Sequence, residues 1–255
     1  MRIVTNTKLA ARNRSIATYL FVATFIVLIG GFFFVNQSLF TQENTASISP
    51  TTLLLQVLVL PIAFVMTVIS IRMTNLWARQ PRPEAVLAES LKGLGKKSVL
   101  YNYHHIPTRH LLICPRGVFA IVTRWHEGRY SVANNTWRTQ ANAISRTLSA
   151  LRRDNVGNPS QEAREAAEHA QKLLAKYAPN VQVQPLVFFL SPRAEVTCDD
   201  ASIQVTFAEG SKQKPTLKDY LRDLARTQEQ SSRKTTTSTM PLSDEAIAAF
   251  ERDTL

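Results

Sequence analysis

The sequence predicts a mixed α/β domain that is preceded by a transmembrane hairpin of two helices. Three observations predict this fold class: two long uncharged runs before residue 72, alternating helical and extended patterns after it, and turn residues between the extended stretches. Helices that alternate with strands are typical of a mixed central sheet with helices on its faces. We therefore expect an α/β or α+β domain behind a membrane anchor.

The two uncharged runs are Ile16–Val35 and Thr52–Ile71. A helix of about 20 residues, rising ~1.5 Å per residue, spans the ~30 Å hydrocarbon core of a bilayer. A signal peptide is the alternative for the first run, but this run is long for one and a second run follows at once. Pro61 is tolerated in a membrane helix, and Gln56 is expected to pack between the two helices.

Basic residues flank the two runs and predict their orientation. They are Arg2, Lys8, Arg12 and Arg14 before the first run, and Arg72, Arg79 and Arg82 after the second. The connecting loop, residues 36–51, contains no Lys or Arg. By the positive-inside rule, both termini and the soluble domain lie in the cytoplasm, and the loop lies outside the cell membrane.

This topology divides the chain into seven segments. They are a basic cytoplasmic N-terminus (1–15), a first transmembrane helix (16–35), an external loop (36–51), a second transmembrane helix (52–71), a cytosolic domain (72–226), a Ser/Thr-rich linker (227–242) and a short C-terminal helix (243–255). The net charge of +11 favours a polyanion or an anionic membrane face as partner, and both interpretations remain open. We expect no disulfide between Cys114 and Cys198.

Local patterns place the elements of the cytosolic part. Pro115-Arg116-Gly117 is a tight turn between two apolar strands, and Asn158, Pro159 and Gln161 form a typical helix start. Residues 141–157 fit no single pattern. The expected helices are Pro81–Leu94, Asn158–Tyr177, Pro215–Ala225 and Ser243–Arg252, and the expected strands are Ser98–Ile106, His110–Cys114, Gly117–Val122, Gly128–Val132, Val181–Leu190 and Ile203–Phe207.

The hairpin carries a resemblance to a known family. The segments that carry it are His110–Ile113, Pro115–Ile121, Thr123, Gly128, Trp137, the helix start at Asn158-Pro159 with Gln161, and Val187–Phe189. Together, within residues 84–190, they resemble the nuclease-related domain, NERD. The resemblance implies a restriction-endonuclease-like fold with a mixed central sheet flanked by helices.

In relatives that look active, the resemblance implies an Asp on the first hairpin strand and Glu-x-Lys on the second. Two carboxylates would hold Mg²⁺, which activates water and stabilises charge on the scissile phosphate. This sequence has Arg109, Val122 and Arg124 at these three positions. Glu84 and Gln161 are the candidate remnants of an acidic site. We expect no catalytic residue, no metal site and no cofactor, with Mg²⁺ needed only if a nuclease activity exists.

Three functions remain as hypotheses. The first is a membrane-tethered, inactive nuclease fold that binds DNA, RNA or another phosphate-rich partner through arginines. These are Arg109, Arg124, Arg129, Arg138, Arg152 and Arg153. The second is a membrane scaffold that binds a protein partner through residues 227–255. The third is an active metal-dependent nuclease with a rearranged site. Trp125 and Trp137 are candidates for stacking on a base, although Trp137 also fits a core position.

Overall fold

A computed structural model describes residues 1–36, 50–140, 156–198, 203–232 and 241–255 of the chain. The chain forms two compact units. One unit consists of Thr7–Arg82, and the other combines Met1–Asn6 with Pro83–Leu255. The ambiguous residues 141–155 and most of the connecting loop expected between the spans lie outside the described residues.

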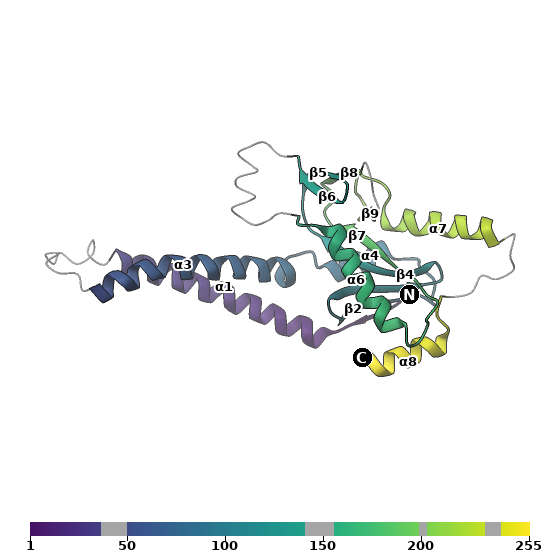
Figure 1. Cartoon of the computed structure of the whole chain (residues 1–255), viewed down its shortest axis with the longest axis horizontal. Coiled ribbons are helices and arrows are strands. Elements are labelled where there is room, and N and C mark those ends of the chain that lie inside the picture. The colour runs from purple at the N-terminus through teal and green to yellow at the C-terminus, as the bar shows by residue number, and fades with distance from the viewer. Residues whose placement is uncertain (37–49, 141–155, 199–202, 233–240) are drawn as a thin grey trace. The chain divides into compact units, whose positions relative to one another are not determined.

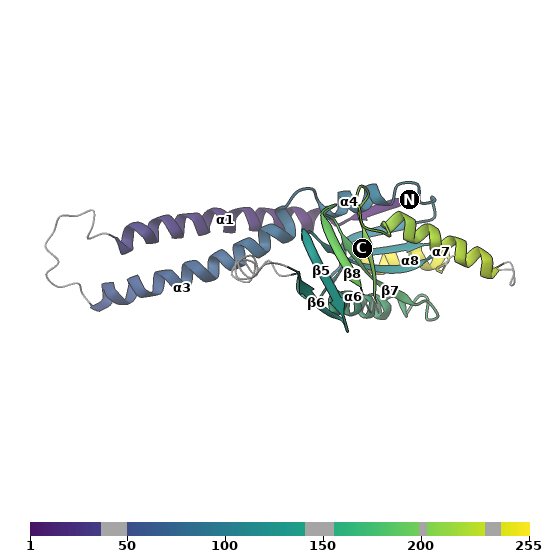
Figure 2. The same ribbon diagram turned by 90° about the horizontal axis from the view of Figure 1, so that it is seen from above.

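The unit Thr7–Arg82 is a pair of long apolar helices, α1 (Thr7–Val35) and α3 (Pro50–Met73), followed by a π-helical turn, η1 (Thr74–Ala78). Both helices are long and apolar enough to cross a membrane, as predicted. They lie side by side (Figures 1 and 2). Small residues recur every seven positions along α1, at Ala10, Ala17, Thr24 and Gly31, and the first three are buried. Small side chains allow membrane helices to pack closely.

The second unit is built on a six-stranded mixed sheet. Its strand order is β1-β2-β3-β4-β7-β9. The strands are β1 (Arg2–Thr5), β2 (Val99–His105), β3 (Thr108–Cys114), β4 (Gly117–Arg124), β7 (Val183–Phe189) and β9 (Gln204–Phe207). Strand β3 runs antiparallel to both of its neighbours, and the other pairings are parallel. This is the mixed central sheet that the sequence predicts.

Helices cover both faces of this sheet (Figures 1 and 2). On one face, α6 (Pro159–Leu174) and α8 (Asp244–Thr254) pack against side chains such as Leu111, Ile113 and Ala120. On the other face, α4 (Pro83–Ser90) and α7 (Leu217–Ser232) pack against Leu112, Phe119 and Ile121. Alternate residues of one strand serve the two faces, and because both are buried these strands read as continuous apolar runs.

A smaller sheet adjoins the first. It has the order β6-β5-β8, from β5 (Gly128–Ala133), β6 (Thr136–Thr139) and β8 (Ala194–Cys198). Asn134 and Asn135 turn between β5 and β6 with φ of 49° and 58°, a conformation that Asn tolerates. Strand β8 was not predicted, because its short polar stretch gives no clear pattern.

The edge strand β1 was also not predicted. It pairs in parallel with β2, with Arg2 opposite Val99 and Thr5 opposite Asn102. The pairing continues beyond the strand, since the amide of Asn6 donates to the carbonyl of Asn102 at 3.0 Å. The sequence segment before α1 is therefore part of the folded domain.

The C-terminal helix forms as predicted. The Ser243 hydroxyl accepts a hydrogen bond from the amide of Ala246 at 3.1 Å and so caps α8. Ile247 and Phe250 are buried in the core on the α6 face. Helix α7 runs to Ser232, beyond the helix expected over Pro215–Ala225, and takes in the start of the expected linker.

Candidate functional site

Strands β3 and β4 form an antiparallel hairpin around the predicted turn. His110 lies opposite Ile121 and Cys114 opposite Gly117. Leu111 and Ala120 belong to the core on the α6 face. Side chains two residues apart on a strand point to the same face, so Arg109, Val122 and Arg124 all lie on that face. The three positions that the resemblance marks are thus brought together at one end of the hairpin.

Arg124 is held by three partners. Its Nε donates to the carbonyl of Val156 at 3.1 Å, and one Nη donates to its own neighbour's carbonyl, that of Thr123, at 3.1 Å. The other Nη lies 2.6 Å from a carboxylate oxygen of Glu162. Only 12% of the Arg124 side chain is exposed. The guanidinium therefore ties β4 to the start of α6.

Glu162 was missed by the sequence analysis. It sits in the first turn of α6, whose N-terminus is capped by the Asn158 side chain, which accepts from the amide of Gln161 at 3.1 Å. A carboxylate in the first turn is favoured by the helix dipole. That position was the available signal, but its pairing with an arginine 38 positions earlier in the chain depends on tertiary packing.

The two candidate remnants of an acidic site lie apart. Glu84 lies in the first turn of α4 and accepts a hydrogen bond from the hydroxyl of Tyr103 at 2.8 Å. Gln161 lies in the first turn of α6 and donates to Glu165 at 2.9 Å. Because α4 and α6 cover opposite faces of the sheet, these residues do not form one site.

The hairpin site does not fit Mg²⁺. The ion takes oxygen ligands, whereas the marked positions supply two guanidinium groups and an apolar side chain. Glu162, the nearby carboxylate, is already paired with Arg124. Among the described residues, no group of three or more His, Cys, Asp or Glu side chains is placed to hold a metal ion.

Of the arginines predicted to bind phosphate, those that the structure describes are divided between the two sheets. Arg109 and Arg124 lie on the large sheet, while Arg129 and Arg138 lie on the small one. Arg129 is in an exposed ion pair with Glu195 at 2.8 Å, and Arg138 is exposed opposite Ser131. Arg152 and Arg153 lie outside the described residues.

The two tryptophans of the domain differ in burial. Trp137 is 9% exposed, donates from Nε1 to the hydroxyl of Ser160 at 2.8 Å and stacks on Phe189. It is a core residue, as one of the two interpretations expected. Trp125 is partly buried beside the core on the α4 face.

Two histidines are buried in neutral form. Burial lowers the pKa of His110 to about 3, and the Arg109 cation adds to this effect. One ring nitrogen of His110 is 2.8 Å from the side-chain oxygen of Asn102. Burial, with smaller contributions from His104 and His169, lowers the pKa of His105 to about 4. These rings are structural groups of the sheet and carry no charge at neutral pH.

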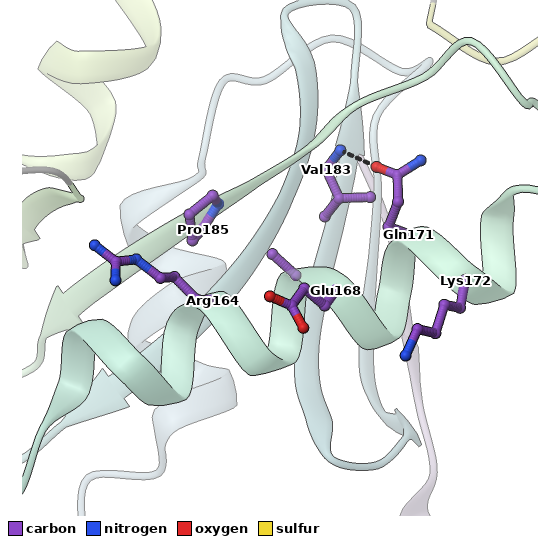
Figure 3. A pocket seen from close by; sticks show the side chains of 7 residues that line it. Arg164, Glu168, Gln171, Lys172, Val183 and Pro185 are labelled. Carbon is purple, nitrogen blue, oxygen red and sulfur yellow. Dashed lines mark hydrogen bonds between the residues drawn. The ribbon is translucent and has the colours of Figure 1, made fainter.

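A groove between α6 and β7 is a second candidate, with a cavity of about 440 Å³ (Figure 3). Its lining includes Ala167, Val183 and Pro185, with Arg164, Glu168 and Lys172 along the helix. Gln171 closes one end, since its side-chain oxygen accepts from the amide of Val183 at 2.7 Å. The charges of the lining are mixed, so the groove favours no one class of ligand.

Comparison with known proteins finds a family model that matches the part of the chain containing the hairpin. Residues 82–190 match the family model described as the nuclease-related domain, NERD. No curated protein and no solved structure matches the chain. The matched range runs from just before α4 to just after β7 and contains the whole hairpin site. Over residues 82–190 this chain is therefore similar to the nuclease-related domain family.

Proposed function

We propose that this protein is a membrane-tethered nuclease-related domain that does not cleave nucleic acid and that binds a phosphate-rich partner at the cytoplasmic face of the cell membrane. The observation that carries the proposal is the ion pair of Arg124 with Glu162. The pair occupies the place where the resemblance expects a catalytic cation beside metal-bound carboxylates.

The absence of cleavage follows from the chemistry of the three marked positions. Activation of water by a metal requires ligands that hold the ion against the phosphate. Arg109 brings a positive charge where a carboxylate would be needed, and Val122 has no polar atom. Arg124 supplies a guanidinium group, which does not serve as a general base.

The tether is supported by the connectivity of the helical hairpin. Its N-terminal end continues into β1 and its C-terminal end into α4, and both elements belong to the same folded unit. Two crossings return the chain to the side of the membrane from which it started. This is required because the segments before and after the hairpin belong to one folded unit. The basic flanks then favour the cytoplasmic side.

Phosphate binding would use the exposed arginines of the small sheet. Arg129 and Arg138 are exposed on this sheet, and Arg109 on the large sheet is partly exposed. An Arg guanidinium can make two parallel hydrogen bonds to a phosphate. Arg124 would contribute through the fold, because its own donors are used by Val156, Thr123 and Glu162.

Binding and cleavage can be tested on the same sample. The full chain in nanodiscs is titrated with labelled DNA and RNA, single- and double-stranded, at about 50 and 200 mM salt, with and without Mg²⁺ or Mn²⁺, and the products are run on a gel. We expect binding that weakens steeply with salt, and no cutting. Arg129→Gln/Arg138→Gln should weaken binding several-fold. Lys212→Gln/Arg226→Gln, which removes two exposed cations from the α7 side, is the matched control.

A scaffold function is the second candidate, and one observation favours it. Three cations near the hairpin, Arg124, Arg129 and Arg193, are each paired with a carboxylate, which reduces the positive field there. A scaffold predicts no salt-sensitive binding of any nucleic acid. A partner that binds residues 227–255 would then meet the polar side of α8, since Ile247 and Phe250 are buried in the domain.

An active nuclease is the outcome that would overturn the proposal. Divalent-dependent cutting by the unaltered chain, abolished by Glu84→Ala, would mean that a rearranged site exists. If Arg129→Gln/Arg138→Gln binds nucleic acid as well as the control does, the small sheet does not supply the phosphate contacts.

A further inference from the structure

The positive charge of the chain is concentrated in its helical hairpin. Residues 7–82 contain six Lys or Arg and one Glu, so this segment carries +5 of the net +11. The Glu, at position 43, lies outside the described residues. The described part of this unit therefore holds six cations and no carboxylate.

All six cations lie at one end of the helix pair, which we name the basic end. They are Lys8, Arg12, Arg14, Arg72, Arg79 and Arg82. Two contacts fix the antiparallel arrangement of α1 against α3 and η1. Nε of Arg14 donates to the carbonyl of Trp77 at 3.2 Å, and Gly31 faces Val59 further along the pair. The arrangement brings the cations of α1 to the level of those around η1.

The basic end adjoins the apolar surface of the hairpin directly. Ile16 and Tyr19 on α1 are 45% and 75% exposed, and Ile71 on α3 is 40% exposed. Arg12 lies one helical turn before Ile16, and Arg72 follows Ile71 at once. Trp77, a residue type that favours the membrane–water boundary, stands among the cations. With the apolar surface in the hydrocarbon core, the basic end lies at the depth of the lipid phosphates.

We infer that the basic end of the hairpin is a binding surface for the phosphate groups of anionic phospholipids. Lys8, Arg12, Arg72 and Arg82 are exposed and supply the donors, while Arg14 holds α1 to η1 through Trp77. No carboxylate in the described part of this unit competes for them, unlike Arg129 with Glu195 in the other unit. The inference rests on the membrane tether of the proposed function and does not depend on nucleic-acid binding.

The test measures which lipids stay with the protein. The full chain is placed in nanodiscs of equal phosphatidylglycerol and phosphatidylcholine, released in mild detergent, and the retained lipids are quantified by mass spectrometry. Nanodiscs expose both leaflets, so the orientation of the chain does not affect the result. We expect phosphatidylglycerol to be enriched about threefold or more, and the enrichment to fall as salt screens the charges.

Two quadruple variants with the same change in net charge distinguish binding at the basic end from a general effect of the protein's positive charge. Neutralising the four exposed cations of the basic end, Lys8, Arg12, Arg72 and Arg82, to Gln should bring the lipid ratio close to one. The control neutralises four exposed cations of the other unit, Lys96, Lys97, Lys212 and Arg226, and should keep the enrichment.

Three results would overturn the inference. They are an equal lipid ratio for the unaltered chain, an equal loss in both variants, or removal of the enrichment by inorganic phosphate at an ionic strength where sodium chloride leaves it intact. A chain that does not enter the nanodiscs at all would overturn the tether as well, so the two failures are distinguishable.

Discussion

Arg124 on β4 and Glu162 in the first turn of α6 form an ion pair of 2.6 Å that joins the β3–β4 hairpin to α6. The pair is asymmetric, because 12% of the arginine side chain is exposed but 55% of the glutamate side chain. Loss of the arginine side chain should therefore destabilise the fold more than loss of the glutamate charge, because the arginine also donates to two backbone carbonyls.

Arg124→Ala should lower the free energy of unfolding by about 2 kcal/mol, because it leaves the buried carbonyl of Val156 without its donor. Glu162→Gln should cost less than about 1 kcal/mol, since its carboxylate is half exposed. Urea unfolding of the full chain in detergent, followed by tryptophan fluorescence, measures both. Arg129→Ala, which breaks an exposed pair, is the control and should be nearly neutral. Equal losses for Arg124→Ala and Arg129→Ala would contradict this account.

The buried histidines predict a loss of stability in mild acid. The pKa values of His110 and His105, about 3 and about 4, lie below the ordinary 6.5. Between pH 6.5 and 4 the unfolded chain binds protons at these rings and the folded chain does not, so stability falls as the pH falls through this window. Urea midpoints measured at intervals from pH 7 to 4 should decrease accordingly. His105→Phe should flatten the decrease, and an unchanged slope would show that His105 does not contribute.

The packing of the two long helices depends on one of two adjacent glycines. A Cβ at Gly31 would lie 2.5 Å from Cγ1 of Val59, whereas a Cβ at Gly30 would meet nothing within 4 Å. Gly31→Leu should therefore lower the thermal midpoint in detergent by about 4 °C or more. Gly30→Leu is the matched control and should leave it unchanged. If both variants have the same thermal midpoint, the helices do not pack through the small residues of α1 that include Gly31.

Helix α8 should be a fixed part of the domain. Phe250 is fully buried and packs against Tyr101, His105 and Tyr177. Phe250→Ala should cost about 3 kcal/mol or more and make the C-terminal segment sensitive to protease. Glu245→Ala, at an exposed position of the same helix, should change stability by less than about 0.5 kcal/mol. Unaltered protease resistance in Phe250→Ala would instead mean that α8 is dispensable for the core.

Sequence reasoning was most successful where the signal is local. The turn at Pro115–Gly117 and the cap at Asn158 placed the hairpin and α6 correctly. The period of two along a strand put Val122 and Arg124 on one face, but bringing Arg109 to the same face needed the pairing of β3 with β4. The partner of Arg124 could not be predicted, because many carboxylates were equally available along the chain. Packing between β4 and α6 selects Glu162.

Strand β1 was beyond local reasoning for a different reason. Its four residues show no pattern of their own, and its partner β2 lies almost a hundred positions later in the chain. The C-terminus adds a second contact that sequence does not signal: Arg2 pairs with Glu251, which also accepts a hydrogen bond from the hydroxyl of Tyr101 at 2.6 Å. Burial and this bond raise the pKa of Tyr101, so its hydroxyl stays protonated.

The position of β1 affects how the soluble part can be isolated. A fragment that begins at Pro83 would lose this strand and leave the backbone of Val99–Asn102 unpaired at the border of the sheet. Unpaired edge strands promote self-association, so such a fragment would aggregate or pair with a second copy of itself. A peptide of the first six residues, supplied to the fragment, would be the simplest way to restore its solubility.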